Sequence, residues 1–484
     1  MVRRDTGGRI FQLPARIPVS HTGGPPTGRV VRGAKMAAVP VAFAGRRVAG
    51  VGKRALGRPA EEVRAEIRAR TAQHMFAVLG ELKGCIAKLG QVLAVYEFVL
   101  PEDVAAPYRE ALGRLQDSAP AMLPATVHAV LADHLGPRWR SLFREFDDRR
   151  PAAASVGQVH RAVWHDGRPV AVKVMYPGAR QAIHDDLVTL RRLSPLFGAL
   201  LPGADVRSVI DALSAYIREE LDYALEADHQ RAFAAAYADD PEFVVPRVVA
   251  QYPDVLVSEW LEGVSLSRVI AGGAPLERDR VGLLVLRFLF SGPARAGLLY
   301  GDPHPGNFRI LPDGRLGVVD FGACAPWPPG FLDMITDIAP ALYSCDPERL
   351  DAAIRRNGYV AAGQPLDAEI VAARLAPVRD AVVAPTLDLH PGWLRTHLGV
   401  LTELRVTNVV RQLTMPSPHT TVARTAVAGL GLLGQLRTTV PVAKEFARWF
   451  PEVAAVLETV DMRRNDAGSE GIATGRVAGR GNQP

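Results

Sequence analysis

The chain has 484 residues, 48% of them hydrophobic and 22% charged, a composition that excludes a fibrous protein and provides for a sizeable buried core. The formal net charge of +6 is uneven, because residues 1–60 carry twelve Arg or Lys and a single acid, which leaves the remainder mildly acidic. Three widely separated cysteines argue against a disulfide framework or zinc site and favour reduced thiols in a cytoplasmic protein.

The first segment, residues 1–59, is predicted to be a basic, partly disordered leader. Within it, residues 29–58 alternate small apolar side chains with Arg and Lys. This pattern is typical of peripheral contact with an anionic membrane, of a targeting peptide or of a solvated arm, and the sequence leaves all three open. We expect no transmembrane segment, because no stretch reaches the roughly 18 uncharged apolar residues that a span needs.

Residues 60–125 are predicted to form a helical extension, in which apolar residues recur at helical spacing around the tetrapeptide KLGQ. Residues 126–264 follow with a strand, a small-residue loop, a strand, an HDGR turn and another strand, hence a β-hairpin, and with inserted helices. Residues 265–462 are predicted to be largely helical, and 463–484 to be a disordered tail. The prediction is an α+β fold with a small β-rich lobe followed by a helical lobe.

The stretch PAAASVGQVH precedes the strand VAVKV, which contains Lys173. A small-residue loop, a strand and a lysine within an apolar run are the parts of a nucleotide-phosphate clamp. Alanines restrict the backbone more than glycines do, so we expect a stiffer phosphate loop than usual. Ser155 and Gln158 are its expected polar contacts to nucleotide, within the candidate set Ala152, Ala153, Ala154, Ser155, Val156, Gly157 and Gln158.

The strongest signal is YGDPHPGNFRILPDGRLGVVDFGA, from Tyr300 onwards. Asp302 and Asn307 have the D-x-x-x-x-N spacing of kinase catalytic loops, and Asp320 lies in a DFG tripeptide that follows after a predicted hairpin. We predict Asn307 and Asp320 as magnesium ligands and Asp302 as the catalytic residue facing the acceptor. His304 is either a phosphate contact or a loop histidine bonded to backbone.

A lysine inside a buried strand requires a partner, and the segment of residues 207–233 supplies several acids. If this segment is one continuous helix, Asp222 and Glu226 share a face, whereas Glu220 lies about 200° from Asp222. We therefore predict an ion pair between Lys173 and Glu226, with Glu220 and Asp222 left for another surface.

With these motifs in order, the chain resembles the UbiB/AarF family of atypical kinases. KLGQ at 88–91 resembles its K-x-G-Q motif, AAASVGQVH its alanine-rich loop and ELD at 220–222 its E-x-D motif, while GDPHPGN and DFG resemble its catalytic and metal loops. The resemblance implies a protein-kinase-like, two-lobed fold with an N-terminal helical extension packed across the active-site cleft. It also implies an ATPase or kinase that uses ATP or ADP with Mg²⁺ and supports isoprenoid quinone or lipid metabolism.

The same resemblance implies a contact of Lys88 with Glu220 or Asp222 that blocks the usual substrate groove, and it implies that the alanine-rich loop biases nucleotide preference. The implied regulatory residues are Lys88, Gly90, Gln91, Glu220 and Asp222. Glu259 completes the set expected to contact nucleotide. The chain departs from the family pattern in EADHQ, where members often carry asparagine near His229, and at Tyr300 and Gly301, where members often carry His-Ala.

The sequence leaves three hypotheses about the function open. The expected partners of the leading one are adenine nucleotide and an isoprenoid or quinone-precursor lipid of ubiquinone or menaquinone type, without nucleic acid. A small-molecule kinase of the aminoglycoside or choline type is a second reading, because GDPHPGN also suits those catalytic loops. A non-catalytic, nucleotide-gated lipid-binding scaffold is the third.

Overall fold

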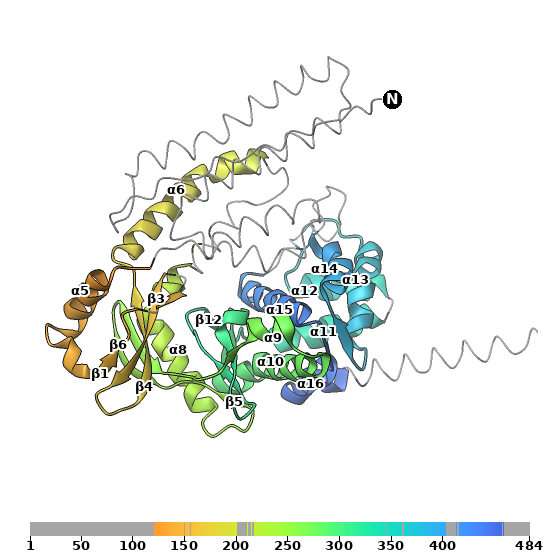
Figure 1. The fold of residues 1–484 in the computed structure, drawn as a ribbon. Helices are drawn as coiled ribbons and strands as arrows, with labels where there is room; N and C mark the ends of the chain where they lie inside the picture. The colour runs from red at the N-terminus through yellow and green to blue at the C-terminus, as the bar shows by residue number, and fades with distance from the viewer. Residues whose placement is uncertain are drawn as a thin grey trace, which may run out of the picture.

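The structure is a computed structural model that describes residues 121–149, 151–154, 156–200, 211, 214, 217–344, 346–360, 363–402, 413, 416–456 and 458. Its architecture is mixed α+β, with a β-rich part at one side and a helix-rich part at the other (Figure 1). The predicted basic leader, the KLGQ segment, Ser155 and the C-terminal tail lie outside the described residues.

The β-rich part contains a six-stranded sheet. Its strands are β1 (Phe143–Phe146), β2 (Ala152–Ala154), β3 (Gly157–Trp164), β4 (Pro169–Met175), β6 (Val248–Tyr252) and β7 (Val255–Glu259). Five of them lie in the order β1-β3-β4-β7-β6, and β2 pairs with β3 beside that path. The printed pairs are all antiparallel. The hairpin predicted around the HDGR turn is confirmed, since β3 and β4 pair from Gly157 to Pro169.

In strand β4, buried valines alternate with residues on the opposite face of the sheet. Val170, Val172 and Val174 are fully buried and pack with Val127 and Leu131 of α5 (Pro124–Leu135). Successive side chains of a strand point to opposite faces, so the lysine between these valines projects from the other face. The alternation thus places one charged group on the side of the sheet away from α5.

Helices border this sheet. After α5 and the short 3₁₀ helix η2 (Trp139–Leu142), α6 (Ala179–Leu200) leaves the end of β4 and runs away from the sheet (Figure 1), and α8 (Tyr223–Ala236) packs against β6 and β7. The expectation of one continuous helix through residue 222 was wrong. Asp222 has a non-helical backbone, and its carboxylate accepts hydrogen bonds from Ala224 N and Leu225 N as the N-cap of α8. The chain therefore starts a new helix at Tyr223.

A second, four-stranded sheet begins the helix-rich part. Its order is β5-β11-β10-β8, formed by β5 (Phe243–Val244), β8 (Val264–Ser265), β10 (Phe308–Ile310) and β11 (Leu316–Val318). Beside it, β9 (Leu298–Tyr300) pairs with β12 (Cys324–Pro326), and the 3₁₀ helix η3 (Pro305–Asn307) lies between β9 and β10. These short strands bring the two ends of the segment from Tyr300 to Cys324 together.

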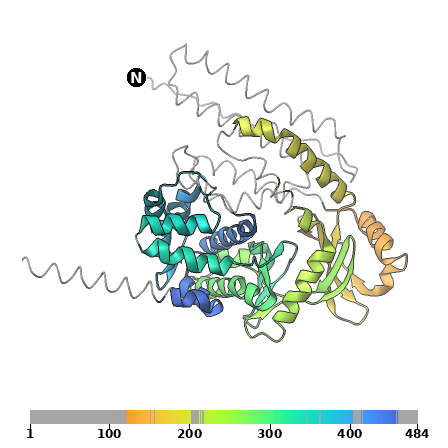
Figure 2. The same ribbon diagram turned by 180° about the vertical axis from the view of Figure 1, so that it is seen from behind.

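The remaining elements are mostly helical, as expected, although short strands interrupt them. The helices are α9 (Leu266–Gly272), α10 (Pro275–Ala296), α11 (Phe331–Tyr343), α12 (Pro347–Arg356), α13 (Ala368–Val382), α14 (Pro391–Thr402), α15 (Ser417–Leu436) and α16 (Val442–Trp449). Strand β13 (Leu387–Leu389) pairs with β14 (Thr438–Val440). Figure 2 shows the helix-rich part from behind; there α10 packs with α9, α15 and α16 and contributes Val285 and Phe288 to the largest buried cluster, while α11, α12 and α13 pack with one another.

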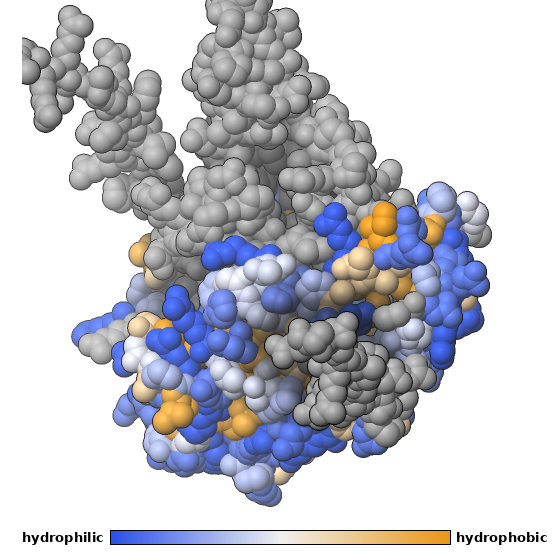
Figure 3. Space-filling view, turned by 90° about the vertical axis from the view of Figure 1, so that its right-hand side faces the viewer, coloured by the Kyte–Doolittle hydropathy of each residue, from blue (hydrophilic) through white to orange (hydrophobic). Residues whose placement is uncertain are grey.

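In the face shown in Figure 3, hydrophobic residues form small separate groups among hydrophilic ones. The large hydrophobic side chains that are exposed come from different parts of the chain: Leu123, Leu225, Val264, Leu276 and Ile370. Among the helices that the structure describes, none has both the length and the apolarity to cross a membrane.

Candidate active site

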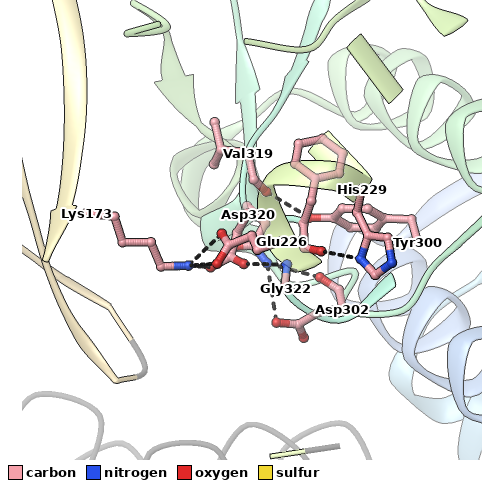
Figure 4. Close-up of polar contacts among 10 residues, drawn as sticks. Lys173, Glu226, His229, Tyr300, Asp302, Val319, Asp320 and Gly322 are labelled. Carbon is pink, nitrogen blue, oxygen red and sulfur yellow. Dashed lines mark hydrogen bonds and ion pairs between the residues drawn. The ribbon is translucent and has the colours of Figure 1, made fainter. Parts of the chain in front are cut away.

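Lys173 projects from β4 toward α8 and meets Glu226 there (Figure 4). Its Nζ donates to Glu226 Oε1 at 2.7 Å and to Oε2 at 2.9 Å. The lysine side chain is 14% exposed and that of the glutamate 2% exposed, so this is a largely desolvated ion pair. The structure forms the pair that the sequence predicted, although α8 begins at Tyr223 instead of continuing from further upstream.

Asp320 is the third member of the charged cluster. Its Oδ2 lies 3.3 Å from Lys173 Nζ, and its Oδ1 accepts from Gly322 N at 3.3 Å. The residue follows β11 and has a φ of 66°, in the left-handed region that residues other than glycine rarely occupy. Residues held in such backbone conformations cluster at active sites. We therefore take Asp320 as the centre of the candidate site.

The three charges change one another's protonation. Burial alone would lower the pKa of Lys173, but the nearby carboxylates of Asp320 and Glu226 outweigh it and raise that pKa well above its usual value. Burial raises the pKa of Glu226 to about 7 against the opposing effect of Lys173, and the negative charge of Asp320 adds to the rise. Two carboxyl groups thus share one ammonium, that of Lys173.

The predicted catalytic loop lies beside this cluster. Asn307 Nδ2 donates to the backbone oxygen of Asp302 at 3.1 Å and to its Oδ2 at 3.4 Å. Val319 N donates to Asn307 O at 2.9 Å, which ties the loop to the residue just before Asp320. His304 Nδ1 accepts from Gly306 N at 3.2 Å. That bond belongs to the loop-histidine alternative, and a phosphate contact by His304 stays a prediction.

A small pocket opens among these side chains. It is lined by Val156, Lys173, Glu220, Glu226, Asp320 and Gly322. Glu220 is 7% exposed, so the acid that helix arithmetic had turned away from the site lies at its wall. Asp222 is instead exposed and caps α8. The difference arises because the helical residues 217–220 end before Asp222 and α8 begins only at Tyr223, a break that the assumption of regular helical spacing excluded.

The alanine-rich stretch was predicted as a loop, but much of it is a strand. In β2, Ala152, Ala153 and Ala154 pair with β3, and a tight connection returns the chain at Gly157. A Cβ on Gly157 would lie 2.1 Å from Val174 O, so glycine is required there by the neighbouring strand. The sequence predicted a stiff loop because alanines restrict the backbone. It did not indicate that these alanines also pair with β3 as a strand.

The contacts of Gln158 differ from the nucleotide contact that was predicted for it. It is 1% exposed, its Oε1 accepts from Met122 N at 2.8 Å, and its Nε2 donates to His160 Nε2 at 2.7 Å. Both ends of the amide are therefore engaged inside the β-rich part, which does not favour the predicted contact with nucleotide.

Glu259 ends β7, where β7 pairs with β4. Its Oε2 accepts from Arg247 N at 3.0 Å, and its Oε1 lies 3.8 Å from Arg168 Nη1. Glu259 is paired with Val170, three residues before Lys173, so it lies about 10 Å along the sheet from the charged cluster. Contact of its carboxylate with nucleotide stays a prediction.

Two contacts in the site were not foreseen. Tyr300 OH donates to Val319 O at 2.9 Å, and His229 Nδ1 lies 3.3 Å from Phe321 O, which can only accept. Both side chains are buried. The available sequence signal was that a tyrosine and a histidine stand at or near two departures from the family pattern, but nothing local indicates where their polar atoms point.

Comparison with known proteins agrees with this geometry. A family model described as "ABC1 atypical kinase-like domain" matches residues 114–353. "Uncharacterized protein slr1919" of Synechocystis sp. is 32% identical over 285 residues, which are 57% of this chain and 49% of that protein. "Atypical kinase COQ8, mitochondrial" of Saccharomyces cerevisiae is 31% identical over 258 residues, 52% of this chain and 50% of that protein. The chain thus spans about half the length of these curated relatives.

A solved structure extends the similarity. "The complex structure of Rv3197-erythromycin from Mycobacterium tuberculosis" is 39% identical, with a TM-score of 0.61, over 81% of this chain and 99% of that chain. The fold and the match to this family model together place the chain among proteins with a kinase-like domain. More specifically, the chain belongs to the UbiB/ABC1 family of atypical kinases.

Proposed function

We propose that this protein is an ATPase or atypical kinase that binds adenine nucleotide with Mg²⁺ and supports isoprenoid quinone or lipid metabolism. The observation that carries the proposal is the contact of Lys173 with both Glu226 and Asp320 beside the Asp302–Asn307 loop. In this assignment Lys173 holds the α- and β-phosphates, Glu226 orients it, and Asp302 positions the acceptor hydroxyl or water.

The donor set fits magnesium. Asp320 offers a carboxylate, and Asn307 donates through Nδ2 to Asp302, which turns its amide oxygen to the other side. In the part of the chain that the structure describes, no group of three or more His, Cys, Asp or Glu side chains forms a metal cluster. Mg²⁺ often binds through one or two protein ligands together with waters and substrate phosphates, so a two-residue set suffices. Bound there, the ion would neutralise charge on the phosphates.

The arrangement supports a two-lobed assignment. The six-stranded sheet with α6, α8 and most of α5 would be the N-lobe of residues 126–264, and residues 265–462 would be the C-lobe. The nucleotide would then lie between them, against Val156 and Lys173. The segment 60–125 would be the helical extension across the cleft. The family resemblance implies that Lys88 contacts either Glu220 or Asp222. We assign this contact to Glu220, because the carboxylate of Asp222 already accepts two hydrogen bonds as the N-cap of α8.

The acceptor is proposed to be a quinone-precursor or isoprenoid lipid, or water. Peripheral contact with an anionic membrane would fall to residues 29–58, whose basic and small apolar residues suit that surface. The support for this part is sequence composition and family membership, and it is independent of the nucleotide site.

The experiment is to measure ADP formation by purified protein with and without Mg²⁺, anionic liposomes and quinone-precursor-like phenols. We expect magnesium-dependent turnover that Lys173→Met abolishes and that liposomes or phenols increase. Turnover that persists in Lys173→Met would overturn the assignment of the phosphate-binding lysine. Nucleotide and lipid binding without turnover under any condition would favour the scaffold over the enzyme.

A second candidate is a kinase acting on a soluble small molecule. It is favoured by the Rv3197 structure, whose title reports a complex of that protein with erythromycin. The same assay with erythromycin and with an aminoglycoside separates the two. An antibiotic whose mass has increased by one phosphoryl group would support this candidate. An antibiotic of unchanged mass, together with ADP formation that lipid stimulates, would exclude it.

A further inference from the structure

Asp320 is flanked by two backbone carbonyls, and each is held by a side chain from a different element. Tyr300, at the end of β9, donates its hydroxyl to the oxygen of Val319, the residue before Asp320. His229, on α8, donates through Nδ1 to the oxygen of Phe321, the residue after it. Figure 4 shows both side chains on the same side of Asp320 and away from Lys173.

The backbone between these two carbonyls includes Asp320, whose φ angle is unfavourable for a residue other than glycine. Asp320 has a φ of 66°, and an L-residue other than glycine keeps such a conformation where its surroundings hold it. Rotation of its φ would displace the preceding peptide unit, which carries Val319 O, and rotation of its ψ would displace the chain that follows, in which the Phe321 carbonyl lies one peptide further on. Bonds to Val319 O and to Phe321 O therefore oppose the relaxation of Asp320 from both directions.

Both donors are shielded from water. Tyr300 is 1% and His229 8% exposed, so solvent cannot readily replace either bond. Burial lowers the pKa of His229, which keeps the imidazole neutral near pH 7, and the acceptor at Phe321 requires the proton on Nδ1. Phe321 itself is fully buried, with its ring 5.2 Å from that of Phe233 and 5.6 Å from that of Tyr300.

The two donors also connect Asp320 to the rest of the site. The residue whose carbonyl Tyr300 holds is also tied to the catalytic loop, because Val319 N donates to Asn307 O at 2.9 Å. On the other side, Glu226 lies one helical turn before His229 on α8, so the same helix carries the partner of Lys173 and the donor to Phe321 O.

We propose that Tyr300 and His229 are positioning residues that hold Asp320, and through Val319 also Asn307, in the geometry required to bind the metal. The inference rests on the proposed function, since it takes these two residues as metal ligands. Tyr300 and His229 touch neither metal nor nucleotide, so their removal should weaken metal binding and leave metal-free nucleotide binding intact.

The test uses Mn²⁺ as a spectroscopic probe for the divalent ion, with a non-hydrolysable ATP analogue and the full chain. Tyr300→Phe removes one hydroxyl and keeps the ring, and His229→Leu removes the donor at similar volume. We expect each to raise the Kd for Mn²⁺ by about threefold to tenfold, the value of one hydrogen bond. The Kd of the analogue without metal should change less than about twofold. His229→Asn, which keeps a donor, should regain part of the affinity.

Tyr237→Phe is the matched control. Tyr237 is also on the α8 side of the core, is 3% exposed, and its hydroxyl bonds to Ser291 Oγ at 2.6 Å rather than to the DFG segment. It should lower the melting temperature without changing the Kd for Mn²⁺. Wild-type metal affinity in Tyr300→Phe and His229→Leu, or an equal loss in Tyr237→Phe, would overturn the inference. Absence of Mn²⁺ binding by the wild type would overturn the proposed function itself, and this inference with it.

Discussion

Lys173 and Glu226 are 53 residues apart in the chain, yet two hydrogen bonds of 2.7 and 2.9 Å join them across the space between β4 and α8. Because Asp320 reaches the same ammonium at 3.3 Å, this pair is also the junction between the sheet and the DFG segment. Its protonation and its surroundings lead to four predictions.

The stability of the ligand-free protein should depend on Glu226 between pH 4.5 and pH 7. The pKa of Glu226 is raised from 4.5 to about 7, so the folded state binds a proton that the unfolded state has already released in this range. The contribution of Glu226 to stability therefore falls as pH rises through this window and is lost above it. In Glu226→Gln this fall should be absent.

Urea denaturation at several pH values would measure this pH dependence. The quantity to compare is the difference in the free energy of unfolding between the wild type and Glu226→Gln. Glu348→Gln, at an exposed position in the first turn of α12, is the control. Parallel profiles for wild type and Glu226→Gln would contradict the raised pKa.

Asp302 and Asp320 should fail in different ways. Asp320→Asn is expected to abolish magnesium-dependent nucleotide binding or turnover, because it removes the proposed charged ligand of the metal. Asp302→Asn should lower turnover by about 100-fold or more while Mn²⁺ and nucleotide still bind, because it removes the group that orients the acceptor. Titration calorimetry together with single-turnover assays distinguishes them. Unchanged binding and turnover in Asp320→Asn would refute the metal assignment.

The alanines of β2 should bias which nucleotide is held. Ala154→Gly, or Ala153→Gly, widens the accessible backbone range in a hairpin that pairs with Gln158 and Gly157. We expect the ratio of ATP to ADP affinity to shift or autophosphorylation to rise. Ala250→Gly in β6 is the control, since it also places glycine in a strand of the same sheet. If neither quantity changes in the β2 variants, the stiff-loop hypothesis is wrong.

Gly157 should be required for packing. A Cβ at this position would lie 2.1 Å from Val174 O and 3.0 Å from Met175 Cα, so Gly157→Ala must push two strands apart. We expect a loss of about 3 kcal/mol in the free energy of unfolding. Gly272→Ala, where an added Cβ meets nothing within 4 Å, should cost less than about 0.5 kcal/mol. Equal costs in chemical denaturation would show that the strands yield.

Much of the site could be predicted because its motifs are local. The DxxxxN spacing, the DFG tripeptide and the β3–β4 hairpin depend on neighbouring residues, and their elements appear where the sequence indicated. The prediction of Glu226 as the partner of Lys173 also succeeded, although its argument assumed an unbroken helix. The break at Asp222 was missed because a helix cap and a mid-helix aspartate look alike in a sequence of good helix formers.

By itself, then, the sequence determined the identity and order of the chemical groups and the family to which they belong. Tertiary structure decided that Glu220 lines the pocket, that Gln158 is buried away from it, and that Tyr300 and His229 hold the backbone around Asp320. The physical reason is range. Spacing and propensity act within a few residues, whereas His229 meets Phe321 across 92 residues through the packing of α8 against the DFG segment.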